Sequence, residues 1–164
     1  MALNKICTLG TILGITGLLL SLHCSYSFSG ATLPPHIKTV GVPLFQNRSP
    51  EFGIDQALTD AVISAITKDN TLKIADPSTA DALLHGTLLR VEDRAGQYDE
   101  MEKASTFQVV LTVEVTFEDT QRDLPLWHAT FTQFGTYTDN RDEGIAQAIE
   151  KLTLDIVNRM VSSW

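Results

Sequence analysis

The clearest pattern in the chain is an alternation of apolar and polar residues from position 107 to position 118. Every second residue is apolar, namely Phe107, Val109, Leu111, Val113, Val115 and Phe117. The positions between them are mostly polar, and they include Thr112, Glu114, Thr116 and Glu118. Because neighbouring side chains of a strand point to opposite faces, this pattern predicts a strand with one face in a core and the other in water.

A second alternating stretch predicts a partner for this strand. Trp127, Ala129 and Phe131 occupy every other position after a polar turn at residues 119–125. Two alternating stretches that are joined by a short turn are typical of a β-hairpin. We therefore expect both stretches to pair as neighbouring antiparallel strands.

Three further segments have extended character. Residues 82–91 predict a strand that is apolar on both faces, and residues 93–105 predict a long solvated loop after it. Residues 37–45 predict a first strand, in which Pro43 indicates an early end or an edge position because proline has no N–H for the ladder. Residues 72–74 predict a short extended piece.

Apolar residues recur every three or four positions in two other segments, which predicts two amphipathic helices. One covers residues 54–68, and the other begins near Asn140 and continues to Met160. Asn140 with Glu143 three residues later is a typical helix start. The order β-α-β-β-β-α predicts an α+β fold, a two-layer sandwich in which two helices cover one face of a four-stranded antiparallel or mixed sheet.

Residues 1–23 have the composition of an export signal peptide. Lys5 is the only charged residue among them, and an apolar run at residues 6–22 follows it. About 17 residues is also the lower limit for a helix that crosses a membrane, so an uncleaved anchor is the alternative. The glycines and threonines inside the run favour the signal. Cleavage would change the formal charge from −8 to −9, because only Lys5 is lost.

The position of the cysteines indicates lipidation of Cys24. Of the two cysteines in the chain, Cys7 lies inside the predicted signal, so cleavage would leave Cys24 at the new N-terminus. Acyl chains on its sulfur and on its amino group would together give a stable membrane anchor. Ser21 and His23 depart from the leucine and the small residue that usually precede a lipidated cysteine.

Residues 24–35 predict a short tether between this cysteine and a single α+β domain at residues 36–164, because the segment is rich in serine, glycine and proline. Tyr26 and Phe28 are the aromatic residues of the tether. Two interpretations of them stay open. They lie at a membrane surface or against a partner, or they pack back onto the domain as an N-terminal strand.

No residue pattern indicates catalysis or a bound metal. His36, His85 and His128 lie in three separate segments without a nucleophile motif beside them, and no two histidines have the spacing of metal ligands. The sequence therefore predicts a protein that is not an enzyme and that has neither a cofactor nor a metal. The 20 acidic residues against 12 basic ones also argue against nucleic acid as a partner.

Several segments together resemble the LptE family of lipopolysaccharide-assembly lipoproteins. Those that look like the lipidated opening and first strand of the family are residues 24–30, 33–35, 38–40 and 45–48. The last of these matches the Phe-x-Asn-Arg end of the family's first strand. The similarity continues through residues 58–60, Ala80, Asp81 and Gly86 to the C-terminal helix, and so covers nearly the whole predicted mature chain.

The resemblance implies a non-catalytic lipoprotein that is lipid-anchored in the outer membrane and faces the periplasm. LptE-family members sit as a plug in the lumen of the outer-membrane barrel LptD and help to deliver lipopolysaccharide to the outer leaflet. An LptD-like β-barrel is then the expected partner, and lipopolysaccharide is a second candidate. The polar face of residues 107–118 is the surface expected to meet a water-filled barrel interior. The net negative charge gives no reason to assign lipopolysaccharide phosphates to Arg90 or Arg94.

An alternative function belongs to another class of protein. A lipoprotein domain with this order of elements could also be a periplasmic activator, or a secretion-pore component that binds another envelope protein. A large β-barrel that copurifies in mild detergent would favour the barrel plug. A ring of identical copies, or a bound peptidoglycan synthase, would favour the alternative.

Overall fold

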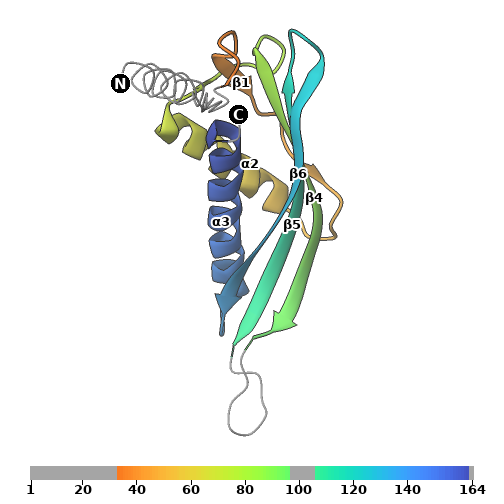
Figure 1. Ribbon diagram of the computed structural model, residues 1–164. Helices are drawn as coiled ribbons and strands as arrows, with labels where there is room; N and C mark the ends of the chain where they lie inside the picture. The colour runs from red at the N-terminus through yellow and green to blue at the C-terminus, as the bar shows by residue number, and fades with distance from the viewer. Residues whose placement is uncertain (1–32, 97–105, 163–164) are drawn as a thin grey trace, which may run out of the picture. The chain divides into compact units, whose positions relative to one another are not determined.

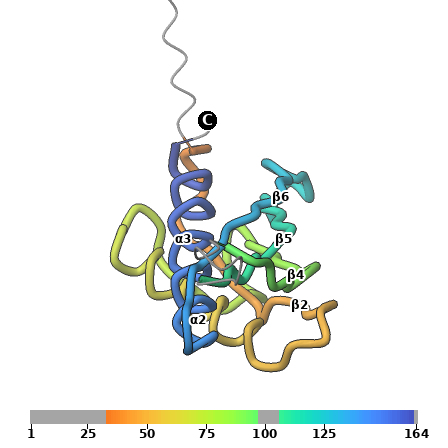
Figure 2. The backbone as a smooth tube through the Cα atoms, turned by 90° about the horizontal axis from the view of Figure 1, so that it is seen from below, coloured from red at the N-terminus to blue at the C-terminus, as the bar shows by residue number. Residues whose placement is uncertain are grey.

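The computed structural model describes residues 33–96 and 106–162 (Figure 1). The elements in chain order are β1 (Thr39–Gly41), β2 (Gln46–Asn47), α2 (Ile54–Asp69), β3 (Lys73–Ile74), β4 (Ala82–Ala95), β5 (Phe107–Asp119), β6 (Leu124–Tyr137) and α3 (Arg141–Ser162). Both helices lie on the same side of the sheet in Figures 1 and 2. The predicted α+β class with two helices on one face is confirmed.

The sheet is mixed, and its six described strands follow the order β3-β1-β4-β5-β6, with β2 also paired to β4. β4, β5 and β6 are antiparallel, whereas β1 and β2 run parallel to β4 and β3 runs parallel to β1. The predicted hairpin is confirmed, because Phe117 pairs with Trp127 and Val113 pairs with Phe131. The predicted count of four strands is wrong, since β2 is an additional two-residue strand and the short extended piece predicted at residues 72–74 forms a strand of its own, β3.

Of the predicted first strand, residues 37–45, only residues 39–41 form a strand, which is β1, and β2 follows just beyond the predicted range. Both pieces pair with the same edge of β4, and they are separated at residues 42–45, where Pro43 cannot donate to the ladder. Phe45 instead buries its ring over Gly86 of β4, and its N–H donates to Thr59 Oγ1 at 3.0 Å. The early end that Pro43 indicated is therefore confirmed, and the chain returns to β4 directly after Phe45.

The predicted loop at residues 93–105 begins later than expected. β4 continues through Asp93 to Ala95, where it is still paired with β5, and residues 97–105 lie outside the described part. β6 is also longer than its alternating stretch and runs from Leu124 to Tyr137. In both cases the neighbouring strand supplies backbone partners beyond the point where the apolar pattern stops, so tertiary pairing decides the length.

The core lies between the helices and one face of the sheet. The odd-numbered residues of β5 from Val109 to Phe117 are fully buried, as the alternation predicted. The helices cover them with the residues that recur at helical spacing, which are Ile54, Leu58, Val62 and Ile66 of α2 and Ala148, Ile149, Leu152, Ile156 and Met160 of α3. The predicted start of α3 is confirmed by Asn140 Oδ1, which accepts the N–H of Asp142 at 3.1 Å. Neither of the two described helices covers the other face of the sheet.

Candidate functional site

The candidate functional surface is the face of the sheet that points away from both helices. Its polar residues come from alternate positions of three paired strands, and they are His85, Thr87, Arg90, Glu92 and Arg94 of β4, Gln108, Thr112, Glu114, Thr116 and Glu118 of β5, and His128, Thr130, Thr132 and Thr136 of β6. All of them are exposed or half-buried. The prediction that one face of residues 107–118 is polar and solvated is therefore confirmed. We call this surface the polar sheet face.

The centre of the polar sheet face is a row of three residues in register. Thr116 of β5 pairs with His85 of β4 on one side and with His128 of β6 on the other. Thr116 Oγ1 lies 2.9 Å from His128 Nδ1, and His128 Nε2 lies 3.8 Å from a carboxylate oxygen of Glu114. His85 Nε2 lies 4.0 Å from a carboxylate oxygen of Glu118. Both histidines thus face solvent and polar partners.

A hydroxyl beside an imidazole also occurs in hydrolytic sites, where the imidazole activates the hydroxyl as a nucleophile. A hydrolytic site needs donors for the developing oxyanion and needs to exclude water. The side chains of His85 and His128 are 48% and 53% exposed, and Thr116 lies on the middle strand of the three, with neighbours on both sides. The geometry favours a hydrated contact surface over a reaction centre.

Charges of both signs lie at the other end of the polar sheet face. Glu92 Oε1 is 3.5 Å from Arg90 Nη1, and Glu92 Oε2 is 3.0 Å from Arg94 Nη2. Such exposed pairs contribute at most about 1 kcal/mol each, so they do little to hold the fold together. Their effect is to keep the face hydrophilic without giving it a strong charge of one sign.

The third histidine belongs to a different part of the molecule. His36 Nε2 lies 2.7 Å from Oδ2 of Asp119, whose side chain is only 1% exposed. Asp119 Oδ1 also accepts the backbone N–H groups of Gln121 at 3.0 Å and Arg122 at 3.2 Å. Burial alone would raise the pKa of Asp119, but these hydrogen bonds, with that of His36 the largest, outweigh burial and lower the pKa. The pair joins the segment before β1 to the end of β5.

Arg141, the first residue of α3, connects three parts of the fold. Its Nη2 lies 2.9 Å from Oδ2 of Asp93 in β4 and 3.0 Å from Oε1 of Glu51 before α2. Tyr137 donates its hydroxyl to Asp93 Oδ1 at 3.0 Å. The hydrogen bond from Arg141 lowers the pKa of Asp93 against the opposing effect of burial, and the same bond raises the pKa of Arg141. This cluster links the end of the sheet to the starts of both helices.

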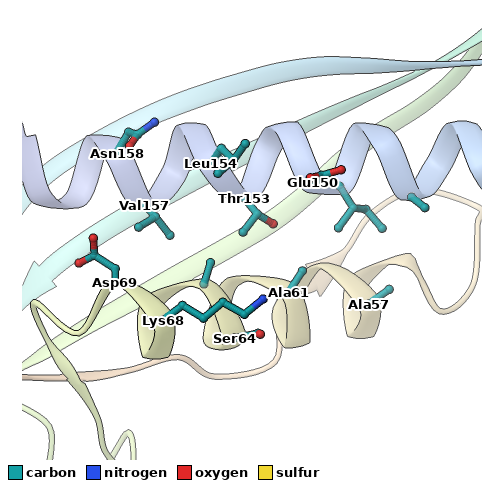
Figure 3. Close-up of a pocket in the computed structure, with 13 residues that line it drawn as sticks. Ala57, Ala61, Ser64, Lys68, Asp69, Glu150, Thr153, Leu154, Val157 and Asn158 are labelled. Atoms are coloured by element: carbon teal, nitrogen blue, oxygen red, sulfur yellow. The ribbon is translucent and has the colours of Figure 1, made fainter.

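A groove with a volume of about 640 Å³ lies between α2 and α3 (Figure 3). Ala57, Ala61 and Ala65 line it from α2 at a spacing of four residues, and Val157 lines it from α3. Thr153 Oγ1 is buried beside it and has no hydrogen-bond partner among the described residues. The groove was not predicted from the sequence, although the alanine spacing on one face of a helix was the available signal.

The predicted lipidation site lies outside the described residues. The same holds for Tyr26, Phe28 and the predicted signal at residues 1–23, so each of these stays a prediction. Within residues 33–96 and 106–162, no helix is long and apolar enough to span a membrane. In the same two ranges, no three His, Cys, Asp or Glu residues are grouped so that they could hold a metal ion.

Several solved bacterial proteins have a similar fold. PelC from Paraburkholderia phytofirmans, solved as a dodecamer, is 16% identical with a TM-score of 0.57 over 79% of this chain and 92% of that one. Protein XCC0632 from Xanthomonas campestris is 14% identical with a TM-score of 0.60 over 79% of this chain and 90% of that one. Lipoprotein GNA1162 from Neisseria meningitidis is 10% identical with a TM-score of 0.50 over 75% and 97%. At these identities the likeness shows a shared fold alone.

Sequence comparison gives the family more directly. No curated protein matches the chain. The model of the family described as "LptE: Lipopolysaccharide-assembly" matches residues 37–162, which is more than half of the chain and contains all the strands and helices described above. The resemblance seen in the sequence is thereby confirmed, and the chain belongs to the LptE family of lipopolysaccharide-assembly proteins.

Proposed function

We propose that this chain is a non-catalytic outer-membrane lipoprotein that is anchored through Cys24 and that docks inside an LptD-like β-barrel during lipopolysaccharide assembly. The observation that carries the proposal is the family match over residues 37–162, because it covers the whole described fold rather than one motif. Membership in an assembly family calls for a body that binds other envelope components. It does not call for a reaction centre.

The polar sheet face supports the docking part of this proposal. It spans three strands, no helix within residues 33–96 and 106–162 covers it, and it carries hydroxyl, imidazole and charged groups of both signs. The interior of an outer-membrane barrel is polar and hydrated, so a surface of this kind can enter it without burying unpaired groups in hydrocarbon. The apolar residues of β5 point the other way, into the protein's own core.

The anchor is tested by incorporation of radiolabelled palmitate in growing cells. The wild-type chain should take up label, and Cys24→Ala should abolish it because the sulfur that carries the diacylglycerol is gone. Cys7→Ala is the matched control and should keep the label, since it removes the other cysteine of the chain. A wild-type chain without label would refute the anchor and leave the docking proposal standing.

Docking is tested by Thr116→Arg at the centre of the polar sheet face. Glu114 and Glu118 lie two residues away on the same face, so the new charge has local partners and the fold should tolerate it. In a fitted lumen the larger side chain should reduce copurification of the barrel at least about tenfold, which corresponds to about 1.4 kcal/mol. Thr67→Arg on the exposed side of α2 is the control and should copurify normally.

Two outcomes would contradict this account in different ways. If Thr116→Arg retains the barrel as well as the wild type does, the polar sheet face is not the docking surface. If the wild type retains no barrel at all, the barrel partner itself is wrong. The alternative, a periplasmic activator or a secretion-pore component, finds its support in the fold shared with the dodecameric PelC. A ring of copies or a bound peptidoglycan synthase in the same preparation would favour it.

A further inference from the structure

β6 forms an edge of the sheet, and one end of that edge is covered by α3. Gln147 accepts the Thr136 N–H at 3.2 Å and donates to the Thr136 carbonyl at 3.3 Å, and Lys151 donates to the Phe134 carbonyl at 2.8 Å. In an antiparallel strand, alternate residues direct both backbone groups to the same side. The backbone N–H and C=O groups of the even-numbered residues of β6 therefore point away from β5. At this end of the strand, side chains of α3 bond to these backbone groups.

α3 does not cover the edge of β6 toward the beginning of the strand. By the same alternation, His128, Thr130 and Thr132 direct their backbone N–H and C=O groups outward. No hydrogen bond between described residues reaches these groups. The end of β6 and the start of α3 lie side by side and then diverge in Figures 1 and 2. The contact of α3 nearest to this half of the edge is the hydrogen bond from Gln133 to Asp155 at 2.6 Å, which uses side chains and leaves the strand's backbone groups free. We call residues 128–132 the open edge.

The open edge also lacks the charges that usually protect edge strands. Residues 124–138 contain no Asp, Glu, Lys or Arg, although 20% of the chain is charged. Natural edge strands are commonly blocked by lysine, by proline or by a bulge, because an unpaired ladder recruits other strands. Here Pro125 and a register shift near it protect only the beginning of β6, and Lys151 and Gln147 protect only its end.

We propose that the open edge pairs antiparallel with the open edge of a second copy of this chain, so that two sheets join into one. The segment is its own complement. With Thr130 opposite Thr130 of the second copy, His128 faces Thr132, so hydroxyl side chains meet each other or an imidazole and no like charges are opposed. Each copy carries a formal charge of −8, which disfavours self-association through its charged surfaces. An uncharged segment such as the open edge avoids this repulsion.

This inference goes beyond the proposed function, since it concerns the protein away from a barrel. A disulfide tests the geometry directly. Bonded antiparallel partners have Cα atoms about 5.5 Å apart, within the range of about 4.4–6.8 Å that a disulfide spans. On mild oxidation of the purified full-length chain, Thr130→Cys should form a covalent dimer. Thr67→Cys, with the same native cysteines and an exposed position on α2, should form no more dimer than the wild type.

Association without a cross-link is tested by sedimentation over a range of concentrations. The wild type should show a concentration-dependent dimer, Thr130→Lys should shift it to monomer because two lysines would face each other, and Thr67→Lys should behave as the wild type. Circular dichroism verifies that each variant is folded. A wild type that stays monomeric throughout would overturn the proposal, and so would equal association of Thr130→Lys and Thr67→Lys, or equal cross-linking of the two cysteine variants.

Discussion

Gly86→Ala should destabilise the fold because β4 has no room for a side chain where Phe45 crosses it. A Cβ added at Gly86 would lie 2.2 Å from Cδ2 and from Cε2 of the Phe45 ring and 2.5 Å from its Cζ. Phe45 is 2% exposed, so its ring cannot move aside without leaving the core. Either the ring shifts to a strained position, or the segment between β1 and β2 moves away from β4.

The magnitude follows from two opposing effects. Adding a methyl group to a packed core costs typically about 1–3 kcal/mol, and the ring at Gly86 places this site at the upper end. Alanine in a strand gains about 0.5–1 kcal/mol over glycine, which offsets only part of the cost. We expect a net loss of about 1.5–2.5 kcal/mol in the free energy of unfolding. Phe45→Leu removes two of the three clashing atoms, Cε2 and Cζ, so in that background Gly86→Ala should cost about 1 kcal/mol less.

The assay is equilibrium unfolding in urea of four chains: the wild type, Gly86→Ala, Phe45→Leu and the double variant. Equal denaturant slopes would show that all four unfold from comparable native states. The double-mutant cycle is its own control, because it separates the contact between the two residues from the effect of each change alone. A stability of Gly86→Ala within about 0.5 kcal/mol of the wild type, or losses that simply add, would refute the reasoning.

Two further predictions concern the ionic contacts. The pKa of Asp119 is lowered, so its charge stabilises the fold above the ordinary pKa near 4 and this stability is lost as the pH falls through the folded-state pKa. Asp119→Asn should therefore lose about 1–3 kcal/mol at pH 7 and show a flatter decline in urea-unfolding stability below pH 4, and an unchanged acid slope would contradict this. Arg141→Met should lower stability by about 1–2 kcal/mol, since it breaks two ion pairs, to Glu51 and to Asp93, whose carboxylates are partly exposed. Arg122→Met, at a 64% exposed side chain 3.9 Å from Asp119, should change stability by less than about 0.5 kcal/mol in the same unfolding assay.

Local periodicity was enough to predict the main elements of the fold. The alternation at residues 107–118 and the helical spacing after Asn140 each depend on which side of a single element faces the core, and the structure has both. The hairpin followed because its two strands are joined by a short turn. The polar sheet face could be predicted for the same reason, since it is the other side of the alternation.

The remaining features depend on partners that are distant in the sequence. The sequence predicts a loop at Asp93 because this residue is charged. In the fold, Asp93 lies at the end of a strand, where its charge is paired with that of Arg141, 48 residues later. β2 is only two residues long and shows no alternation, so it could not be predicted, and it forms because β4 offers a free edge. The extended piece predicted at residues 72–74 becomes the strand β3 because β1 offers it a partner. The groove between α2 and α3 arises from the way two helices pack, which neither helix shows alone.

The central claim is that this protein works by docking into a barrel, and its most direct test is the composition of the complex extracted from outer membranes in mild detergent. We expect one acylated copy of this chain bound to one large β-barrel of the LptD type. The claim would be contradicted by a chain that keeps residues 1–23, by a freely soluble periplasmic protein, or by a membrane-extracted ring of copies without a barrel.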